Sequence, residues 1–190
     1  SGGIMLAQMM KMVESRNIAA MGFHTAESVH LMVEIERRAY ADRANFMGDP
    51  DFVRVPVKTM LSDDYLLQRM SDYEPGRAGN SKTTVSGIIP ESEETTHISI
   101  IDDTGNAVSV TTTLNDSYGS RLVVPGAGFL LNNEMDDFSI REGYPNLYGA
   151  IGNAANAIAP RKRMLSSMTP TIVLKDGLPY IIAGSPGGTT

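Results

Sequence analysis

The sequence has 190 residues, 42% of them hydrophobic and 20% charged, which is typical of one globular domain or part of a larger one. The formal net charge is −6 without a basic run, which argues against a nucleic-acid partner, and no apolar run approaches the roughly 18 to 20 residues of a membrane span. Cysteine is absent and histidine occurs three times, which excludes disulfides, thiolate zinc sites and cysteine nucleophiles and gives no indication of a metal cluster.

The first half of the chain is predicted to be helical. Residues 4–13 are apolar, rich in methionine and nearly free of helix breakers. We expect Thr25 to cap a second helix, which the turn residues Gly48-Asp49-Pro50 end. The apolar positions of this helix, three and four residues apart, are Val29, Met32, Val33, Ile35, Ala39 and Tyr40. Ser62, followed by two aspartates, predicts a further helix that runs to about residue 71.

The second half is predicted to contain strands. Residues 96–101 and 107–114 alternate in polarity on either side of a turn, which indicates a hairpin. Residues 171–174 and 180–183 indicate a second hairpin, and residues 128–132 form one more candidate strand. Helices followed by paired strands predict an α+β fold, with helices layered on a sheet.

Two long segments lack clear periodicity. Residues 74–94 are rich in Gly, Pro, Ser, Thr and charge, which predicts a flexible linker or a mobile loop. Residues 136–163 contain several glycines, prolines and asparagines, and a connection of this length is usually functional or disordered.

Thr95 is a candidate nucleophile at the start of the first predicted strand. A threonine hydroxyl needs a base, and the threonine's own α-amine can serve if the chain is cut directly before it. The flexible segment that leads to Thr95 suits such a cut. The alternative is that Thr95 merely begins a strand, as β-branched residues often do.

Three further clusters have both a functional and a structural interpretation. The turn Gly184–Gly188 presents backbone N–H groups for an anion or an oxyanion, or it is simply a turn; the P-loop pattern is absent. Residues 132–137 combine amides and carboxylates that either hold an ammonium group or form a solvated turn. Ser166-Ser167 either bind a carboxylate or cap a local turn.

Together these motifs, in their order and spacing, resemble the small subunit of gamma-glutamyltranspeptidases. The resembling segments are Thr95-Thr96-His97, Leu114-Asn115, Leu131–Phe138, Pro145–Gly149, Leu165–Thr171 and Gly184–Gly188. Ser1–Gly3, Tyr40–Arg43 and Gly48–Val53 resemble the end of the family's large subunit. The resemblance covers essentially the whole chain.

The resemblance implies a catalytic role for several residues. Thr95 is the self-processing and catalytic nucleophile, released by a cut between Glu94 and Thr95. Thr113, on the neighbouring strand, hydrogen-bonds the nucleophile and assists its activation. Gly187 and Gly188 supply the oxyanion hole. No metal or organic cofactor is implied.

The resemblance also implies a substrate site. Asn115, Glu134 and Asp137 bind the α-amino and α-carboxyl ends of the gamma-glutamyl group, and Ser166-Ser167 take the α-carboxylate side. Tyr148 falls in the loop that covers the site. The implied substrates are glutathione or a related gamma-glutamyl amide, with water or an amino acid as acceptor. The implied location is the periplasm or the outside of the cell.

The resemblance implies an N-terminal-nucleophile hydrolase fold, an αββα sandwich, of which this chain holds an internal part. We expect residues 1–73 to end the large subunit, 74–94 to be the linker before the cut, and 95–190 to begin the catalytic small subunit. The large-subunit arginine that clasps the substrate carboxylate is expected before Ser1, and further elements after Gly188. We therefore expect this segment to be inactive by itself.

Two alternatives remain at this point. One is a cephalosporin or glutaryl-type acylase of the same superfamily, which Asp137 argues against because a glutaryl group has no α-amine to pair with it. The other is a catalytically silent, unprocessed fragment. Binding of a gamma-glutamyl analogue would argue against silence.

Overall fold

The computed structural model describes residues 2–80 and 95–186, with helices in the first range and strands in the second. The helices are α1 (Gly2–Glu14), α2 (Ile18–Met21), α3 (Ala26–Phe46), α4 (Val57–Met60) and α5 (Asp63–Arg69). The strands are β1 (Thr95–Ile101), β2 (Ala107–Thr113), β3 (Thr171–Lys175) and β4 (Leu178–Ala183), with 3-10 turns η1 (Glu134–Asp137) and η2 (Ala154–Asn156). The predicted α+β class is therefore confirmed.

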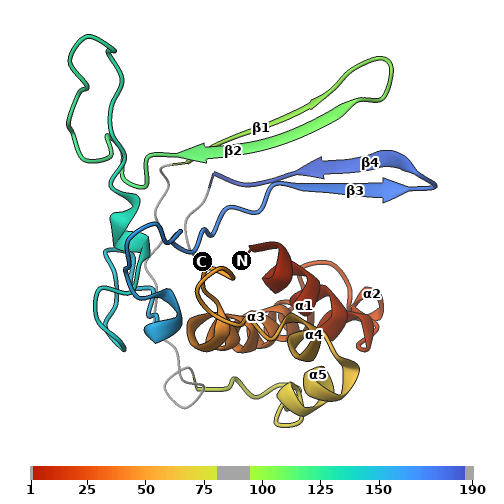
Figure 1. Ribbon diagram of the computed structural model, residues 1–190. Helices are drawn as coiled ribbons and strands as arrows, with labels where there is room; N and C mark the ends of the chain where they lie inside the picture. The colour runs from red at the N-terminus through yellow and green to blue at the C-terminus, as the bar shows by residue number, and fades with distance from the viewer. Residues whose placement is uncertain (1, 81–94, 187–190) are drawn as a thin grey trace.

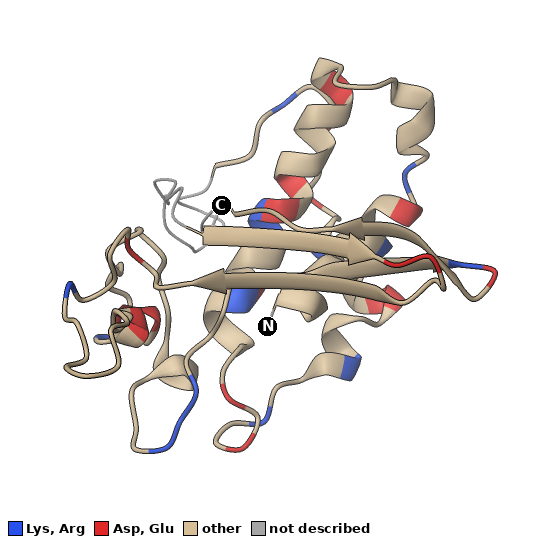
Figure 2. Cartoon of the chain, turned by 90° about the horizontal axis from the view of Figure 1, so that it is seen from above, with Lys and Arg blue, Asp and Glu red and all other residues tan. Residues whose placement is uncertain are grey.

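The elements are arranged in layers. The antiparallel hairpin β1–β2 lies over the antiparallel hairpin β3–β4, and the helices lie beneath (Figure 1). The two hairpins touch, and Ser109 Oγ donates a hydrogen bond of 3.2 Å to the Ala183 carbonyl. Seen from above, the charged residues gather on the helices, the loops and the hairpin tips (Figure 2). The strands, in which Lys175 at the end of β3 is the one Lys, Arg, Asp or Glu residue, thus form the layers that carry the candidate site.

The predicted helix starts at Thr25 and Ser62 are confirmed. Thr25 Oγ1 accepts a hydrogen bond of 3.2 Å from the Ser28 N–H at the start of α3. Helix α3 ends at Phe46, directly before the predicted turn. Ser62 precedes α5, although that helix ends at Arg69 rather than at residue 71. The one-turn helices α2 and α4 were not predicted, because four residues are too few to show a helical period.

The predicted apolar face of α3 was wrong in part. Val29 and Val33 are 41% and 43% exposed. Besides the predicted Ile35 and Ala39, the buried face carries charged residues: Glu34, Arg38 and Asp42 are each less than 5% exposed. These residues are buried because they are paired, with Arg38 Nη1 2.7 Å from Glu34 Oε2. Charged side chains at helical spacing look like a solvated face in a sequence, and only the tertiary contacts distinguish the two.

The hydrophobic core lies in the helical layer. One cluster contains Met5, Ala39, Met47, Met60 and Leu165, and the other contains Met12, Leu31, Ile35, Leu66 and Met70. Leu165 belongs to the first cluster, and it is the one buried member of the two clusters that comes from residues 95–186. It therefore joins the second half of the chain to the helices. The segment around Leu165 is therefore seated directly on the helical layer.

The candidate strand at residues 128–132 is not formed. The structure has an isolated antiparallel bridge between Val123 and Leu130 in its place. Gly126 and Gly128 have φ values of 79° and 75°, which lie in the left-handed region and interrupt an extended strand. The predicted irregular segment 136–163 contains the end of η1, the turn η2 and short bridges.

The segment after α5 lies against α3 as far as the structure describes it. The Gly79 N–H donates a hydrogen bond of 2.8 Å to Glu34 Oε1, and His30 Nε2 lies 3.1 Å from the Arg77 carbonyl. The predicted flexibility of residues 81–94 falls outside the described residues. Among the helices of residues 2–80 and 95–186, none has the length and apolar character that a bilayer crossing requires.

Candidate active site

Strands β1 and β2 place hydroxyl groups on one face. Thr95 is paired with Thr113 in the antiparallel register, and His97 with Thr111. Because side chains alternate across a strand, these four residues share one face of the hairpin. His97 Nδ1 lies 2.8 Å from Thr111 Oγ1, and its Nε2 lies 3.0 Å from Ser99 Oγ. The other face carries exposed Ile98, Ile100, Val108 and Val110.

The polar face of this hairpin looks toward the end of β4. A Cβ atom on Gly184 would overlap the His97 ring, so the backbone after β4 approaches β1 at a point that only glycine permits. The predicted oxyanion residues Gly187 and Gly188 lie outside the described residues. Their role stays a prediction.

Asn115 connects strands β1 and β2 to the rest of the candidate site. It adopts a φ of 76°, a left-handed conformation that asparagine tolerates better than most residues. In this turn the Asn115 N–H donates a hydrogen bond of 2.9 Å to Thr113 Oγ1. Its side-chain Nδ2 donates to the Asn133 carbonyl at 3.4 Å, and Tyr148 Oη donates to the Asn115 carbonyl. Thr113, Asn115 and Tyr148 are thus held together.

The acidic residues form the single turn η1, next to Asn133. Burial raises the pKa of Glu134, and burial together with neighbouring carboxylates raises the pKa of Asp137 to about 6, although the charge of Arg43 opposes this. Asp136 Oδ2 accepts a hydrogen bond of 2.8 Å from the Leu147 N–H. The acidic turn therefore anchors the loop that carries Tyr148.

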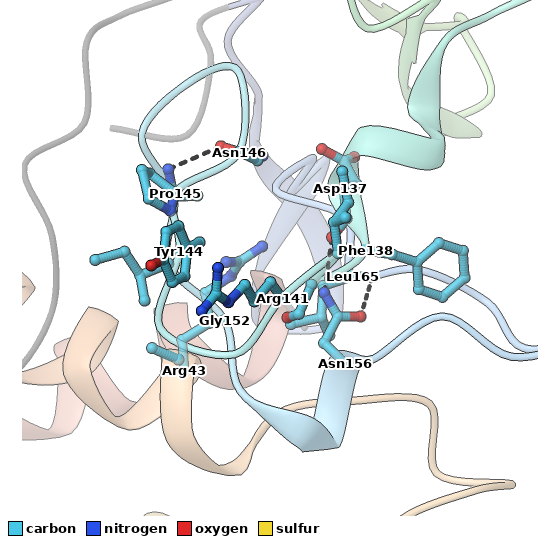
Figure 3. Close-up of a pocket in the computed structure, with 15 residues that line it drawn as sticks. Arg43, Asp137, Phe138, Arg141, Tyr144, Pro145, Asn146, Gly152, Asn156 and Leu165 are labelled. Carbon is cyan, nitrogen blue, oxygen red and sulfur yellow. Dashed lines mark hydrogen bonds between the residues drawn. The ribbon is translucent and has the colours of Figure 1, made fainter.

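A cavity of about 220 Å³ lies between η1, this loop and helix α3. Arg43, Asp137, Arg141 and Tyr144 line it, and Figure 3 shows their side chains around the opening. Arg141 stacks over the Tyr144 ring, with its guanidinium carbon 4.1 Å from the ring centroid. The lining combines two cations, one carboxylate and apolar surface, so it suits a small polar group.

The two candidate serines are held by different partners. Arg43 Nη2 donates a hydrogen bond of 3.3 Å to Ser167 Oγ, which connects helix α3 to the serine segment. Ser166 Oγ accepts a hydrogen bond of 3.1 Å from the Met168 N–H. Ser167 therefore faces the helical layer, and Ser166 takes part in a local turn of the kind considered above.

Asn156 joins the serine segment to the acidic turn. Its Nδ2 donates a hydrogen bond of 2.7 Å to the Asp137 carbonyl, and its Oδ1 accepts one of 3.3 Å from the Leu165 N–H (Figure 3). The side chain is nearly fully buried. Sequence reasoning assigned no role to Asn156 or Arg43, because their partners lie far away along the chain. The signal for Arg43 was present only as part of the resembling motif Tyr40–Arg43.

The structure thus connects Thr95, Thr113, Asn115, the acidic turn and Tyr148 through strand pairing and hydrogen bonds. Ser167 joins this group through Arg43. Within residues 2–80 and 95–186, no group of three or more His, Asp or Glu side chains is placed to hold a metal ion. The arrangement offers the hydroxyl groups of Thr95 and Thr113 together with the carboxylates of the acidic turn, which suits acyl transfer from a substrate that carries an ammonium group.

Comparison with protein families gives a match over the full length of the chain. The family profile described as gamma-glutamyltranspeptidase matches residues 1–190. The glutathione hydrolase proenzyme of Pseudomonas aeruginosa is 48% identical over 191 residues, which cover 100% of this chain and 34% of that protein. The acylase ACY 1 proenzyme of Pseudomonas sp. strain SE83 is 36% identical and covers 98% of this chain and 31% of its own length. The chain spans about a third of these relatives.

Among solved structures, the cephalosporin acylase of Bacillus halodurans superposes with a TM-score of 0.66 at 22% identity. The superposition covers 94% of this chain and 29% of the acylase. This likeness concerns the fold alone, and it confirms the fold class that the resemblance implied.

Proposed function

Because the chain belongs to the gamma-glutamyltranspeptidase family, we propose that the protein containing it is a gamma-glutamyltransferase or glutathione hydrolase. It transfers the gamma-glutamyl group of glutathione, or of a related amide, to water or to an amino-acid acceptor. The observation that carries this proposal is the pairing of Thr95 with Thr113 on a hydroxyl-bearing strand face, joined through Asn115 to an acidic turn.

In the proposed mechanism, the protein first cuts itself between Glu94 and Thr95, which frees the α-amine of Thr95. This amine takes the proton of the Thr95 hydroxyl while the hydroxyl oxygen attacks the gamma-carbonyl carbon of the donor. The donor C–N bond breaks, and the leaving amine receives the proton. Water or an acceptor amine then attacks the gamma-glutamyl ester and restores the hydroxyl. No metal or organic cofactor takes part.

Thr113 and the two glycines assist this chemistry in the proposal. Thr113 hydrogen-bonds the nucleophile, which its place opposite Thr95 supports. Gly187 and Gly188 donate their N–H groups to the developing oxyanion, a role that rests on the family resemblance.

In the proposal, the donor's amino-acid head is bound by residues from the turn after β2, from η1 and from the serine segment. Glu134, Asp137 and Asn115 hold the α-ammonium group and part of the α-carboxyl group, and Ser166-Ser167 hold the α-carboxylate. The half-buried setting of the acidic turn supports this assignment, because an ammonium ion bound there gains a charge-assisted contact with less competition from water than at an exposed site. Tyr148 belongs to a loop over the site.

The division of the chain follows from the proposed cut. Residues 1–73 end the large subunit, 74–94 lead to the cut, and 95–190 begin the small subunit. The remainder of the large subunit is the principal protein partner of this segment, and the mature enzyme lies in the periplasm or outside the cell. The relatives are proenzymes of which this chain covers a third, which supports the partner assignment.

The second candidate is a glutaryl-type acylase, which the likeness to acylase ACY 1 favours. A direct comparison of gamma-glutamyl and glutaryl anilides as donors for the full-length protein separates the two. The proposal expects the gamma-glutamyl anilide to be cleaved with a much higher kcat/KM, because the acidic turn has an ammonium group to pair with. A preference for the glutaryl anilide would favour the acylase, and cleavage of neither donor would contradict both.

A further inference from the structure

The segment that carries the two serines is held on one side by the helical layer. Arg163, Leu165 and Ser167 are alternate residues, and each has its partner there. In an extended segment alternate side chains point the same way, so one face of residues 163–167 is turned toward α3 and the loop after it.

The first contact joins Arg163 to Asp49, in the loop after α3. The Arg163 N–H donates a hydrogen bond of 2.8 Å to Asp49 Oδ2, and its Nε donates one of 3.1 Å to the same oxygen. Its Nη2 contacts both Asp49 Oδ1 and Asp51 Oδ2. The Asp49 side chain is only 1% exposed. Asp49 therefore accepts hydrogen bonds from both the backbone and the side chain of Arg163. These bonds fix the direction of the chain at Arg163 as well as its distance from the loop after α3.

The second and third contacts follow at intervals of two residues. Leu165 is 7% exposed and packs in a core cluster with Ala39 and Met47. Ser167 Oγ accepts the hydrogen bond from Arg43 Nη2. Arg43 is partly buried on the last turn of α3, and the neighbouring Asp137 also acts on its charge. One guanidinium thus lies between the serine segment and the acidic turn.

From this arrangement we propose that Arg43 and Asp49 are positioning residues. They hold Ser166-Ser167 in the position and orientation needed to bind the donor α-carboxylate. The inference rests on the proposed function for its substrate. It also has a consequence for the cut protein. A cut before Thr95 leaves Arg43 and Asp49 on one polypeptide and Arg163 and Ser167 on the other, so these contacts hold the two products together at the site.

The first test measures hydrogen exchange of residues 163–168 in the full-length protein, which needs no catalytic activity. Asp49→Asn and Arg43→Gln are compared with wild type. The expected result is faster exchange in this segment, with α1 and α5 unchanged. Asp63→Asn is the matched control, because its ion pair with Lys11 also joins two elements (2.8 Å) but the Asp63 side chain is 82% exposed. Unchanged exchange at residues 163–168 in both variants would overturn the proposal.

The second test separates positioning from general stability through two donors. One is a gamma-glutamyl anilide, and the other is the 4-aminobutyryl anilide, which lacks the α-carboxylate. For Arg43→Gln we expect KM for the first donor to rise about tenfold, the usual effect of losing one charge-assisted contact. KM for the second donor should change less than about twofold, and Arg43→Lys should restore part of the loss. An equal effect on both donors would overturn the proposal.

A double-mutant cycle covers the case in which one variant is poorly folded. If Arg43 acts through Ser167, the substitution Arg43→Gln should raise KM much less in the Ser167→Ala variant than in the wild-type protein. Fully additive effects would contradict the proposed connection. Wild-type protein that does not cleave the gamma-glutamyl anilide would count against the proposed function, while the exchange measurement would still decide the positioning.

Discussion

Thr95 and Thr113 lie directly opposite each other in the antiparallel register of β1 and β2. Directly opposed residues in such a ladder have Cβ atoms about 5 Å apart and on the same face. Thr113 Oγ1 is in turn fixed by the Asn115 N–H at 2.9 Å. The strand pairing thus brings a second, oriented hydroxyl to the proposed nucleophile within a single hairpin.

Removing this second hydroxyl should slow both self-cleavage and turnover. For Thr113→Ala in the full-length protein we expect kcat to fall by about 10²-fold, the lower end of the range for groups that assist proton transfer. Thr113→Ser keeps a hydroxyl and should retain most of the activity. The measurement is kcat for a gamma-glutamyl anilide together with the rate of proenzyme cleavage. Equal activity of Thr113→Ala and wild type would remove Thr113 from the mechanism.

The raised pKa of Asp137 predicts a pH dependence of substrate binding. Burial raises this pKa from 3.8 to about 6, so the carboxylate that would pair with the donor ammonium group forms only as the pH rises through 6. Binding of a gamma-glutamyl analogue should tighten about tenfold between pH 5 and 7. A glutarate analogue without the α-amine should not show this gain. Parallel pH profiles of the two inhibition constants would contradict the assignment.

The raised pKa of Asp137 also predicts how the stability of the folded protein changes with pH. Because the folded-state pKa of Asp137 lies above its unfolded value, ionisation of this residue costs stability, and the cost grows between about pH 4 and 6 and is complete above that. Asp137→Asn should therefore gain stability relative to wild type above pH 6 and lose that advantage below pH 4. Urea unfolding at the two pH values gives the comparison.

Tyr148→Phe tests the contact between the loop and Asn115. The Tyr148 hydroxyl donates to the Asn115 carbonyl, and its loss should cost about 1 kcal/mol at this contact. We expect KM for the gamma-glutamyl donor to rise severalfold and amide exchange in residues 144–152 to become faster, while proenzyme cleavage is unaffected. Unchanged exchange in that loop would show that the hydroxyl does not hold it.

The buried Arg38 is predicted to be important for the stability of the helical layer. Arg38 is bound to Glu34 at 2.7 Å and to Asp72 at 2.6 Å. Arg38→Ala would leave the buried Glu34 Oε2 without its arginine partner, and we expect a loss of about 3 kcal/mol, the lower end of the range for breaking a buried pair, because Glu34 Oε1 keeps its own partners. Urea unfolding measures the loss. Arg77→Ala, which breaks an exposed pair with Glu74, should cost about 1 kcal/mol or less; equal losses would contradict the prediction.

The pH dependence of the stability loss in Arg38→Ala provides a second check. Burial alone would raise the pKa of Glu34, but hydrogen bonds from Arg38 and from the Gly79 N–H bring it below its usual value. The stability contributed by this carboxylate is therefore present above its unfolded pKa and is lost as the pH falls through the folded one. The difference between wild type and Arg38→Ala should shrink below about pH 4.

Local signals in the sequence predicted the local structure. Thr25 and Ser62 marked helix starts, and the turns at 102–106 and 175–177 marked the two hairpins. The candidate strand at 128–132 is not formed, because Gly128 has a positive φ that interrupts an extended strand. Periodicity alone could not detect this.

Contacts between residues far apart in the sequence could not be predicted. The contact between Arg43 and Ser167 joins residues 124 positions apart, and the contact between Asp49 and Arg163 joins residues 114 apart. A single sequence contains no local signal for either. The resemblance identified the serines as candidates but did not indicate what holds them, and no local pattern indicated that charged residues of α3 are buried.

The central claim is that Thr95 is a nucleophile released by self-cleavage. The most direct test is the intact mass of the denatured full-length protein, with the N-terminal sequence of its products, for wild type and Thr95→Ala. We predict two polypeptides from wild type, the smaller beginning Thr95-Thr96-His97, and one uncut polypeptide from Thr95→Ala. A single uncut wild-type species, or the same cut in the variant, would contradict the claim.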